Sequence, residues 1–205
     1  MDAAFFLVFA QALLIGLSIA APVGPIGLLV IQRTLLHGRT TGLATGLGAA
    51  AADALYGAVG AFGVSTLIQA LQGARVPLAL GGGAFMLWLA WRTWQAAPPD
   101  RAAKVTDARG LAGAFAGTFL LTLSNPATIF SFIAIFGSLG ARGPVASPWP
   151  MIAGVLVGSA LWWLFLCAVV GRLRARFDAR WQRRVNHVSA ALLAAFALWQ
   201  WGSLW

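Results

Sequence analysis

The sequence predicts an all-α integral membrane protein with about six transmembrane helices. Of its 205 residues, 60% are hydrophobic and only 9% are charged, whereas a soluble domain carries about 25% charged residues. The apolar residues gather into six segments, each near the roughly 20 residues that a helix needs to cross a bilayer. These segments are residues 4–31, 42–71, 76–94, 111–137, 149–171 and 187–205.

We expect one transmembrane domain, residues 1–205, because no polar stretch is long enough to form a second domain. The N-terminus lacks a basic region and a clear cleavage site, so we interpret the first apolar segment as a retained span rather than a signal peptide. The formal charge of +9 lies in short loops, which favours a role in membrane orientation over nucleic-acid binding.

The basic residues predict the topology. The first, third and fifth loops are residues 32–41, 95–110 and 172–186. These loops and their immediate flanks hold all of the 14 basic residues except Arg75 and Arg142. Positively charged loops stay in the cytoplasm, so we expect the odd loops inside and both termini outside.

Matched prolines indicate an internal repeat. Pro22 interrupts the first apolar segment, and Pro126 interrupts the fourth about half a chain later. Proline removes a helical hydrogen bond and clashes with the preceding turn, so both helices should break there. Three segments per half, about 1–95 and 111–205, require the halves to be inverted in the membrane. Two ordinary kinks are the alternative, but matched broken helices in inverted halves favour a transporter.

Around these breaks the chain resembles the LysE/RhtB family of bacterial amino-acid exporters, part of the LysE superfamily. The resemblance covers essentially the whole chain through its length and its six-segment profile. Its motifs are Pro22-Val-Gly24-Pro25-Ile-Gly27, Gly38-Arg39, Gly42, Gly46-Leu-Gly48, Asp53-Ala-Leu-Tyr56-Gly57 and Asn125-Pro126.

The resemblance implies a secondary active exporter of amino acids or similar small metabolites. It implies antiport against protons in a multi-pass protein of the bacterial cytoplasmic (inner) membrane, with an amino acid, protons and membrane lipid as partners and no cofactor. A homo-oligomer is compatible with it. The identity of the amino acid is left open, since such a family would include exporters of cationic and of neutral amino acids.

Asp53 is the candidate for the chemistry of transport. It lies in the middle of the second apolar segment, whereas the other four acidic residues lie outside such segments. An ionisable side chain at membrane depth is costly and usually faces a cavity or a partner. We expect its carboxyl to carry a proton or to bind a substrate ammonium group. The alternative is a structural carboxyl that bonds a neighbouring helix.

The two proline motifs predict a substrate site built from backbone. A broken span exposes N–H and C=O groups that must be satisfied within the protein or by a ligand. At Pro22, Gly24 and Pro25, a helix N-terminus would suit a carboxylate and freed carbonyls an ammonium group. Asn125, beside Pro126, adds an amide that either contacts the ligand or caps the break.

Aromatic and small residues supply weaker candidates. Tyr56 lies on the same helix face as Asp53, so it could bond the carboxyl, line the path or simply pack. Trp163 could line a cavity or face lipid. Glycine pairs of small-xxx-small spacing favour close helix packing. These pairs are Gly42 with Gly46, Gly113 with Gly117, and Gly154 with Gly158.

Other classes fit less well. The chain has no zinc-protease or P-loop motif, so we do not expect an enzyme. Its single cysteine, Cys167, excludes an intrachain disulfide, and the apolar segments lack the thiolates or imidazoles that a heavy-metal site needs. A channel, or a carrier for another small solute or ion, stays an alternative because broken helices also build pores.

The predicted topology can be tested with single cysteines in a Cys167→Ser background. We expect Lys104→Cys and Arg176→Cys to resist an impermeant maleimide applied from outside, because their loops are the basic ones. Arg142→Cys, in the fourth loop, should be labelled from outside and serves as the control. Strong external labelling at position 104 or 176 would overturn this orientation.

Overall fold

The computed structural model is all-helical in the part of the chain that it describes. That part comprises residues 3–22, 24–62, 75–95, 108–125, 128–129, 131–132, 148–173 and 179–202. Its main helices are α1 (Ala3–Ala20), α2 (Pro25–His37), α3 (Arg39–Ala61), α5 (Arg75–Gln95), α6 (Ala108–Leu123), α8 (Pro148–Leu173) and α9 (Ala179–Gly202).

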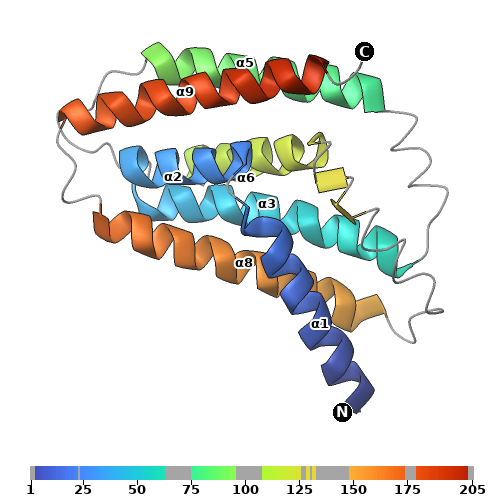
Figure 1. The fold of residues 1–205 in the computed structure, drawn as a ribbon. Helices are drawn as coiled ribbons and strands as arrows, with labels where there is room; N and C mark the ends of the chain where they lie inside the picture. Colours follow the sequence, from blue (N-terminus) through green and yellow to red (C-terminus); the bar gives the residue numbers. More distant parts are fainter. Residues whose placement is uncertain are drawn as a thin grey trace.

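The helices stack in layers (Figure 1). Helices α5 and α9 lie side by side and form one layer, and α2, α3 and α6 lie between this pair and α8. Helix α1 crosses α8 and packs on it, while α3 contacts both α6 and α8. Helices α3 and α8 run antiparallel, since Arg39 meets Gly171 at one end and Gly57 meets Val155 at the other.

The first apolar segment is broken where its prolines predict. Helix α1 ends at Ala20 and α2 begins at Pro25, and the two helices are bent by 78°. Proline fits the first turn of α2 because the N–H that it lacks has no helical acceptor there. In the fourth segment, α6 ends at Leu123, and helix is described again at residues 128–129 and 131–132.

Two predicted loops are corrected by the structure. Residues 32–41 are not a loop, because α2 continues to His37 and α3 begins at Arg39. Gly38 alone joins them with φ 96°, a left-handed conformation that glycine adopts without a steric penalty. Residues 172–186 are likewise mostly helical, since α8 runs to Leu173 and α9 starts at Ala179.

Six spans are predicted, but only some of the described helices are long and apolar enough to cross a membrane. Among the described helices, α8 is long and apolar enough to span a membrane on its own, and α1 with α2 passes as one bent pair. Helix α3 is rich in glycine and alanine and contains Asp53, which lowers its hydropathy. The second segment's residues 63–71 lie outside the described residues, so the span count stays a prediction.

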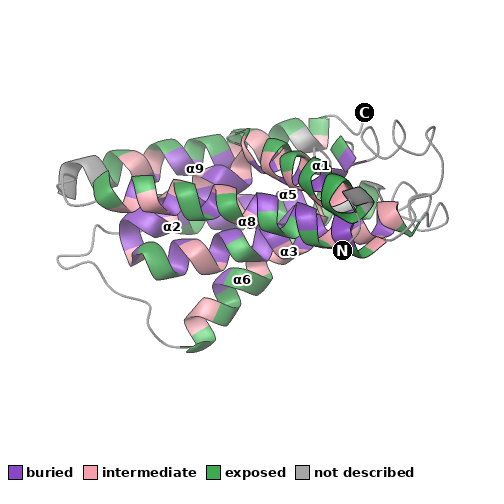
Figure 2. Cartoon of the chain, turned by 90° about the horizontal axis from the view of Figure 1, so that it is seen from below, coloured by how far each residue is buried: buried purple, intermediate pink, exposed green. Residues whose placement is uncertain are grey.

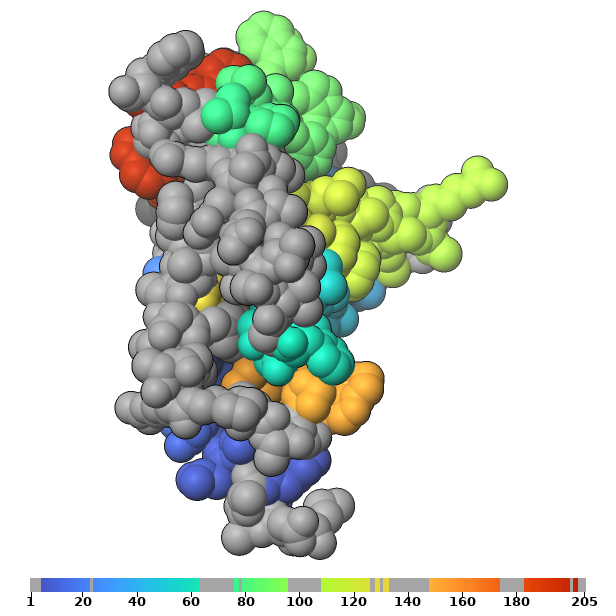
Figure 3. All heavy atoms as spheres, turned by 90° about the vertical axis from the view of Figure 1, so that its right-hand side faces the viewer, coloured from blue at the N-terminus to red at the C-terminus, as the bar shows by residue number. Residues whose placement is uncertain are grey.

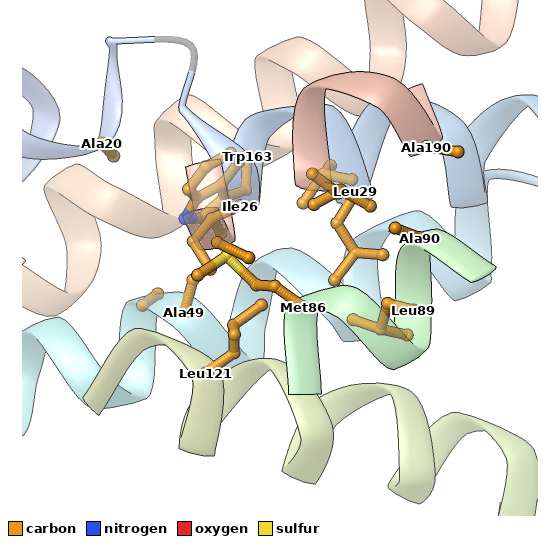
Figure 4. Packing of buried hydrophobic residues seen from close by; sticks show 14 of the residues in the cluster. Ala20, Ile26, Leu29, Ala49, Met86, Leu89, Ala90, Leu121, Trp163 and Ala190 are labelled. Atoms are coloured by element: carbon orange, nitrogen blue, oxygen red, sulfur yellow. The ribbon is translucent and has the colours of Figure 1, made fainter. Parts of the chain in front are cut away.

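The buried core joins the α5–α9 layer to α2, α3 and α8. Its largest cluster brings together Leu29 of α2, Ala49 of α3, Met86 of α5, Trp163 of α8 and Leu193 of α9. Figure 4 shows Met86 reaching toward Ile26, Ala49 and Trp163. Figure 2 shows exposed residues recurring along α1 and α6. Large exposed apolar side chains, such as Leu120 and Phe165, are typical of helices that face lipid.

Glycines allow the backbones to approach at the helix crossings. A Cβ on Gly158 or Gly154 of α8 would collide with the backbone of α1, and a Cβ on Gly46 of α3 would collide with the Trp163 side chain. Gly113 differs, because nothing lies within 4 Å of its Cβ position. The start of α6 that carries Gly113 projects from the molecule (Figure 3). Two of the three predicted glycine pairs therefore pack helices.

Alanine at two of these glycines should have opposite effects on stability. We expect Gly158→Ala to destabilise the fold by about 1–3 kcal/mol, since the added methyl overpacks the α1–α8 crossing. Gly113→Ala should be neutral or stabilising by up to about 1 kcal/mol through helix propensity. Thermal unfolding in detergent measures both, and equal midpoints for the two variants would contradict the packing argument.

Candidate functional site

Both chain breaks open onto one cavity of about 320 Å³. Pro22, Gly24 and Pro25 line it from the break between α1 and α2, and Asn125 lines it from the end of α6. Asp53 lines it from α3. Segments that are distant in sequence therefore meet at one site, and five of the predicted site residues border the same space.

Asp53 sits at the end of a buried chain of hydrogen bonds. The Ser159 hydroxyl of α8 donates to Oδ2 of Asp53 at 2.7 Å, and Trp163 Nε1 donates to the Ser159 oxygen at 3.1 Å. Asp53 is 3% exposed and Ser159 is fully buried. An indole N–H can only donate, so the direction of the Trp163–Ser159 bond is fixed, and an ionised Asp53 is the terminal acceptor of this chain.

The break between α1 and α2 brings together backbone N–H groups, which carry partial positive charge, and backbone carbonyl groups, which carry partial negative charge. The first hydrogen bond of α2 runs from the Leu28 N–H to the Gly24 carbonyl at 3.0 Å. The N–H groups of Ile26 and Gly27 therefore have no acceptor within the helix. No side chain caps this helix start. On the other side, Ile19 and Ala20 line the cavity at the carbonyl end of α1.

Tyr56 lies outside the cavity lining, so of the three alternatives for this residue the structure favours packing. Its hydroxyl instead donates to the Leu123 carbonyl at 2.6 Å. Its ring stacks on Phe132 with centroids 5.3 Å apart. Because α6 ends at Leu123, this hydrogen bond satisfies a carbonyl at the second break from outside the cavity. Pro126 lies outside the described residues.

Thr122 is a polar cavity residue that the sequence did not single out. It lines the cavity, is 3% exposed, and its Oγ1 has no hydrogen-bond partner within the described part of the chain. By contrast, Thr45 and Thr118 donate to the carbonyl one turn earlier, at 2.8 and 2.9 Å. In the sequence, the position of Thr122 one turn before Asn125-Pro126 could have indicated a role in the site, but threonine is common in apolar helices.

Arg33 also departs from its predicted role as a loop charge. It lies half-buried on α2 and donates to Thr45 Oγ1 at 3.1 Å and to the Ala114 carbonyl at 3.2 Å. These bonds tie α2 to both α3 and α6.

Among the described residues, no group of three or more His, Cys, Asp or Glu side chains could hold a metal ion.

The comparison with protein families decides the class. The family described as LysE type translocator matches residues 17–199. The chain belongs to this family. Its members are membrane transporters rather than enzymes, which agrees with the resemblance seen at the proline motifs. The matched region includes both breaks and Asp53.

Two relatives indicate how far the similarity extends. The chain is 33% identical over 173 residues to the membrane protein YahN of Escherichia coli, covering 82% of this chain and 78% of YahN. It is 26% identical over 201 residues to a Bacillus subtilis protein named "Putative amino acid efflux protein YcgF", covering 94% of each. No solved structure matches this translocator significantly.

Removing the Tyr56 hydroxyl should weaken the fold of this translocator. We expect Tyr56→Phe to cost about 1–3 kcal/mol, because the Leu123 carbonyl at the end of α6 loses its buried donor. Ser124→Ala is the matched control, since its hydroxyl donates to the Leu120 and Leu121 carbonyls of the preceding turn of α6. Thermal unfolding in detergent compares them, and a Tyr56→Phe protein as stable as the wild type would refute the proposed support of the break.

Proposed function

We propose that this translocator is a secondary active exporter of amino acids or similar small metabolites, driven by proton antiport across the bacterial inner membrane. The observation that carries the proposal is the shared cavity, in which Asp53 borders the broken ends of two helices. Membership of the translocator family and a relative named for amino acid efflux also support this proposal.

The groups around the cavity are complementary to a zwitterion. Helix N-terminal N–H groups bind anions, so the first N–H groups of α2 suit a substrate carboxylate. The hydroxyl of Thr122 and the amide of Asn125 add hydrogen-bonding capacity on the α6 side. The carbonyl end of α1, at Ile19 and Ala20, carries partial negative charge and suits the substrate ammonium group.

Asp53 is suited to carry the coupled proton. Its partner is the neutral hydroxyl of Ser159 rather than a cation, so the site can hold the carboxyl in either protonation state. An ionised Asp53 attracts a substrate ammonium group in the same cavity, and a protonated Asp53 does not. Proton binding therefore favours substrate release, which is the coupling that antiport needs.

An inverted repeat would explain how the cavity alternates between the two sides of the membrane. The packing supports it, because α1 pairs with α8 while α3 pairs with α6, as expected when the halves exchange partners. Asp53 and Ser159 are 106 residues apart, close to the separation of Pro22 and Pro126. In this proposal they are equivalent positions of the two halves and meet near their symmetry axis.

Asp53→Asn tests the proton role, since asparagine keeps the size of the side chain but cannot ionise. We expect the variant to insert and fold, to lose proton-driven net export, and to retain exchange of substrate for substrate at a raised KM. Exchange moves no net proton, but the neutral asparagine resembles the protonated carboxyl, which attracts the ammonium group less. Asp107→Asn is the control for removing an acidic residue outside the apolar segments. Export, exchange and thermal stability are measured on one purified, reconstituted preparation.

The outcomes separate the alternatives. Loss of both export and exchange would mean that Asp53 binds the substrate ammonium directly. Reduced stability with normal transport per folded molecule would make it structural. Wild-type export and pH dependence in a stable Asp53→Asn protein would remove it from the mechanism. Absence of saturation and of trans-stimulation in the wild type would indicate a channel.

A further inference from the structure

One side of the cavity is formed by helices that carry none of the predicted site residues. Met86 reaches the cavity from α5, and Phe196 and Trp199 reach it from α9. Met86 is almost fully buried, Phe196 is half-buried, and Trp199 is 63% exposed. We call these three side chains the α5–α9 wall. Helices α5 and α9 pack chiefly on each other, so the wall is one structural unit.

The uncharged polar side chains and the α5–α9 wall lie on different elements around the cavity. The hydroxyl and amide side chains, Thr122, Asn125, Thr128 and Ser131, all come from α6 and the chain that follows it. The α5–α9 wall offers a thioether and two aromatic rings. A substrate whose amino and carboxyl groups are bound at the breaks would thus direct its side chain toward apolar surface.

The charge of the cavity restricts that side chain further. Among the described residues that line it, Asp53 is the only ionisable one. Positions 23, 126, 127 and 130, which adjoin the lining residues in sequence, are Val, Pro, Ala and Phe. Burying a charged group without a partner is costly, and Asp53 is already engaged in the proposed coupling.

We propose that this translocator selects amino acids with an uncharged, apolar side chain, and that the α5–α9 wall is its specificity-determining surface. The inference rests on the proposed function and names its substrate class. The cavity of about 320 Å³ has room for a whole amino acid of this kind. Each methylene buried against the wall strengthens binding about fourfold, so selection among apolar side chains is graded by size.

The substrate class is tested by counterflow into proteoliposomes that contain the purified full-length protein. The panel is leucine, methionine and phenylalanine against lysine, arginine and glutamate. We expect uptake of the apolar amino acids to exceed that of the charged ones at least tenfold. Lysine, arginine or glutamate transported as well as leucine would overturn this inference alone. Transport of no amino acid would overturn the proposed function as well.

Phe196→Ala tests the role of the wall. Removing the ring enlarges the cavity, so the uptake ratio of phenylalanine to leucine should rise about tenfold, the lower end of what one pocket contact discriminates. Phe165→Ala is the matched control, because Phe165 is 57% exposed on α8 and does not line the cavity. Its ratio should equal that of the wild type.

A second variant keeps the test decisive if Phe196→Ala does not fold. Trp199→Leu changes the exposed member of the wall and should also alter the ratio of phenylalanine to leucine. An unchanged ratio in every wall variant that folds and transports would overturn the assignment of the wall. A changed ratio in Phe165→Ala of the same size would overturn it too, since that residue lies elsewhere.

Discussion

The close contact between α3 and α8 is the constraint on which the rest of the structure depends. Gly46 leaves room for the Trp163 side chain, and Trp163 and Ser159 then form the hydrogen-bond chain that ends on Asp53. An isolated carboxyl in an apolar interior would be strongly disfavoured. The crossing therefore makes a buried acid tolerable, and it holds that acid at the border of the cavity where the two broken helices meet.

The backbone groups at the breaks and the Asp53 carboxyl are all polar groups that would be costly to expose to lipid. Polar main-chain groups at membrane depth require partners within the protein or in an enclosed cavity. The ends of α1, α2 and α6 gather around one space, and Tyr56 satisfies the Leu123 carbonyl on its outer side. The same arrangement that keeps the backbone groups away from lipid also leaves some of them at the border of the cavity.

The sequence predicted what depends on local chemistry. Pro22 and Pro25 stop a helix wherever the chain goes, and Asp53 stands out in any apolar run, so the breaks and the acid were found. It could not predict contacts made through space. Gly38 marks a turn, but nothing local shows that one residue suffices to reverse the chain. Tyr56 shares a helix face with Asp53, yet packing against Leu123 and Phe132 decides its direction. Met86 and Phe196 read as ordinary apolar residues until α5 and α9 are seen beside the cavity.

The one-residue joint at Gly38 has a mechanical consequence. Helices α2 and α3 pack together, and Arg33 on α2 bonds Thr45 on α3, so the two helices form a clasped hairpin. This bond and the short joint fix the spacing between the N-terminal end of α2 and the Asp53 carboxyl, so a displacement of one displaces the other. Because α1 and α3 both pack on α8, the first break is held against Asp53 from two sides.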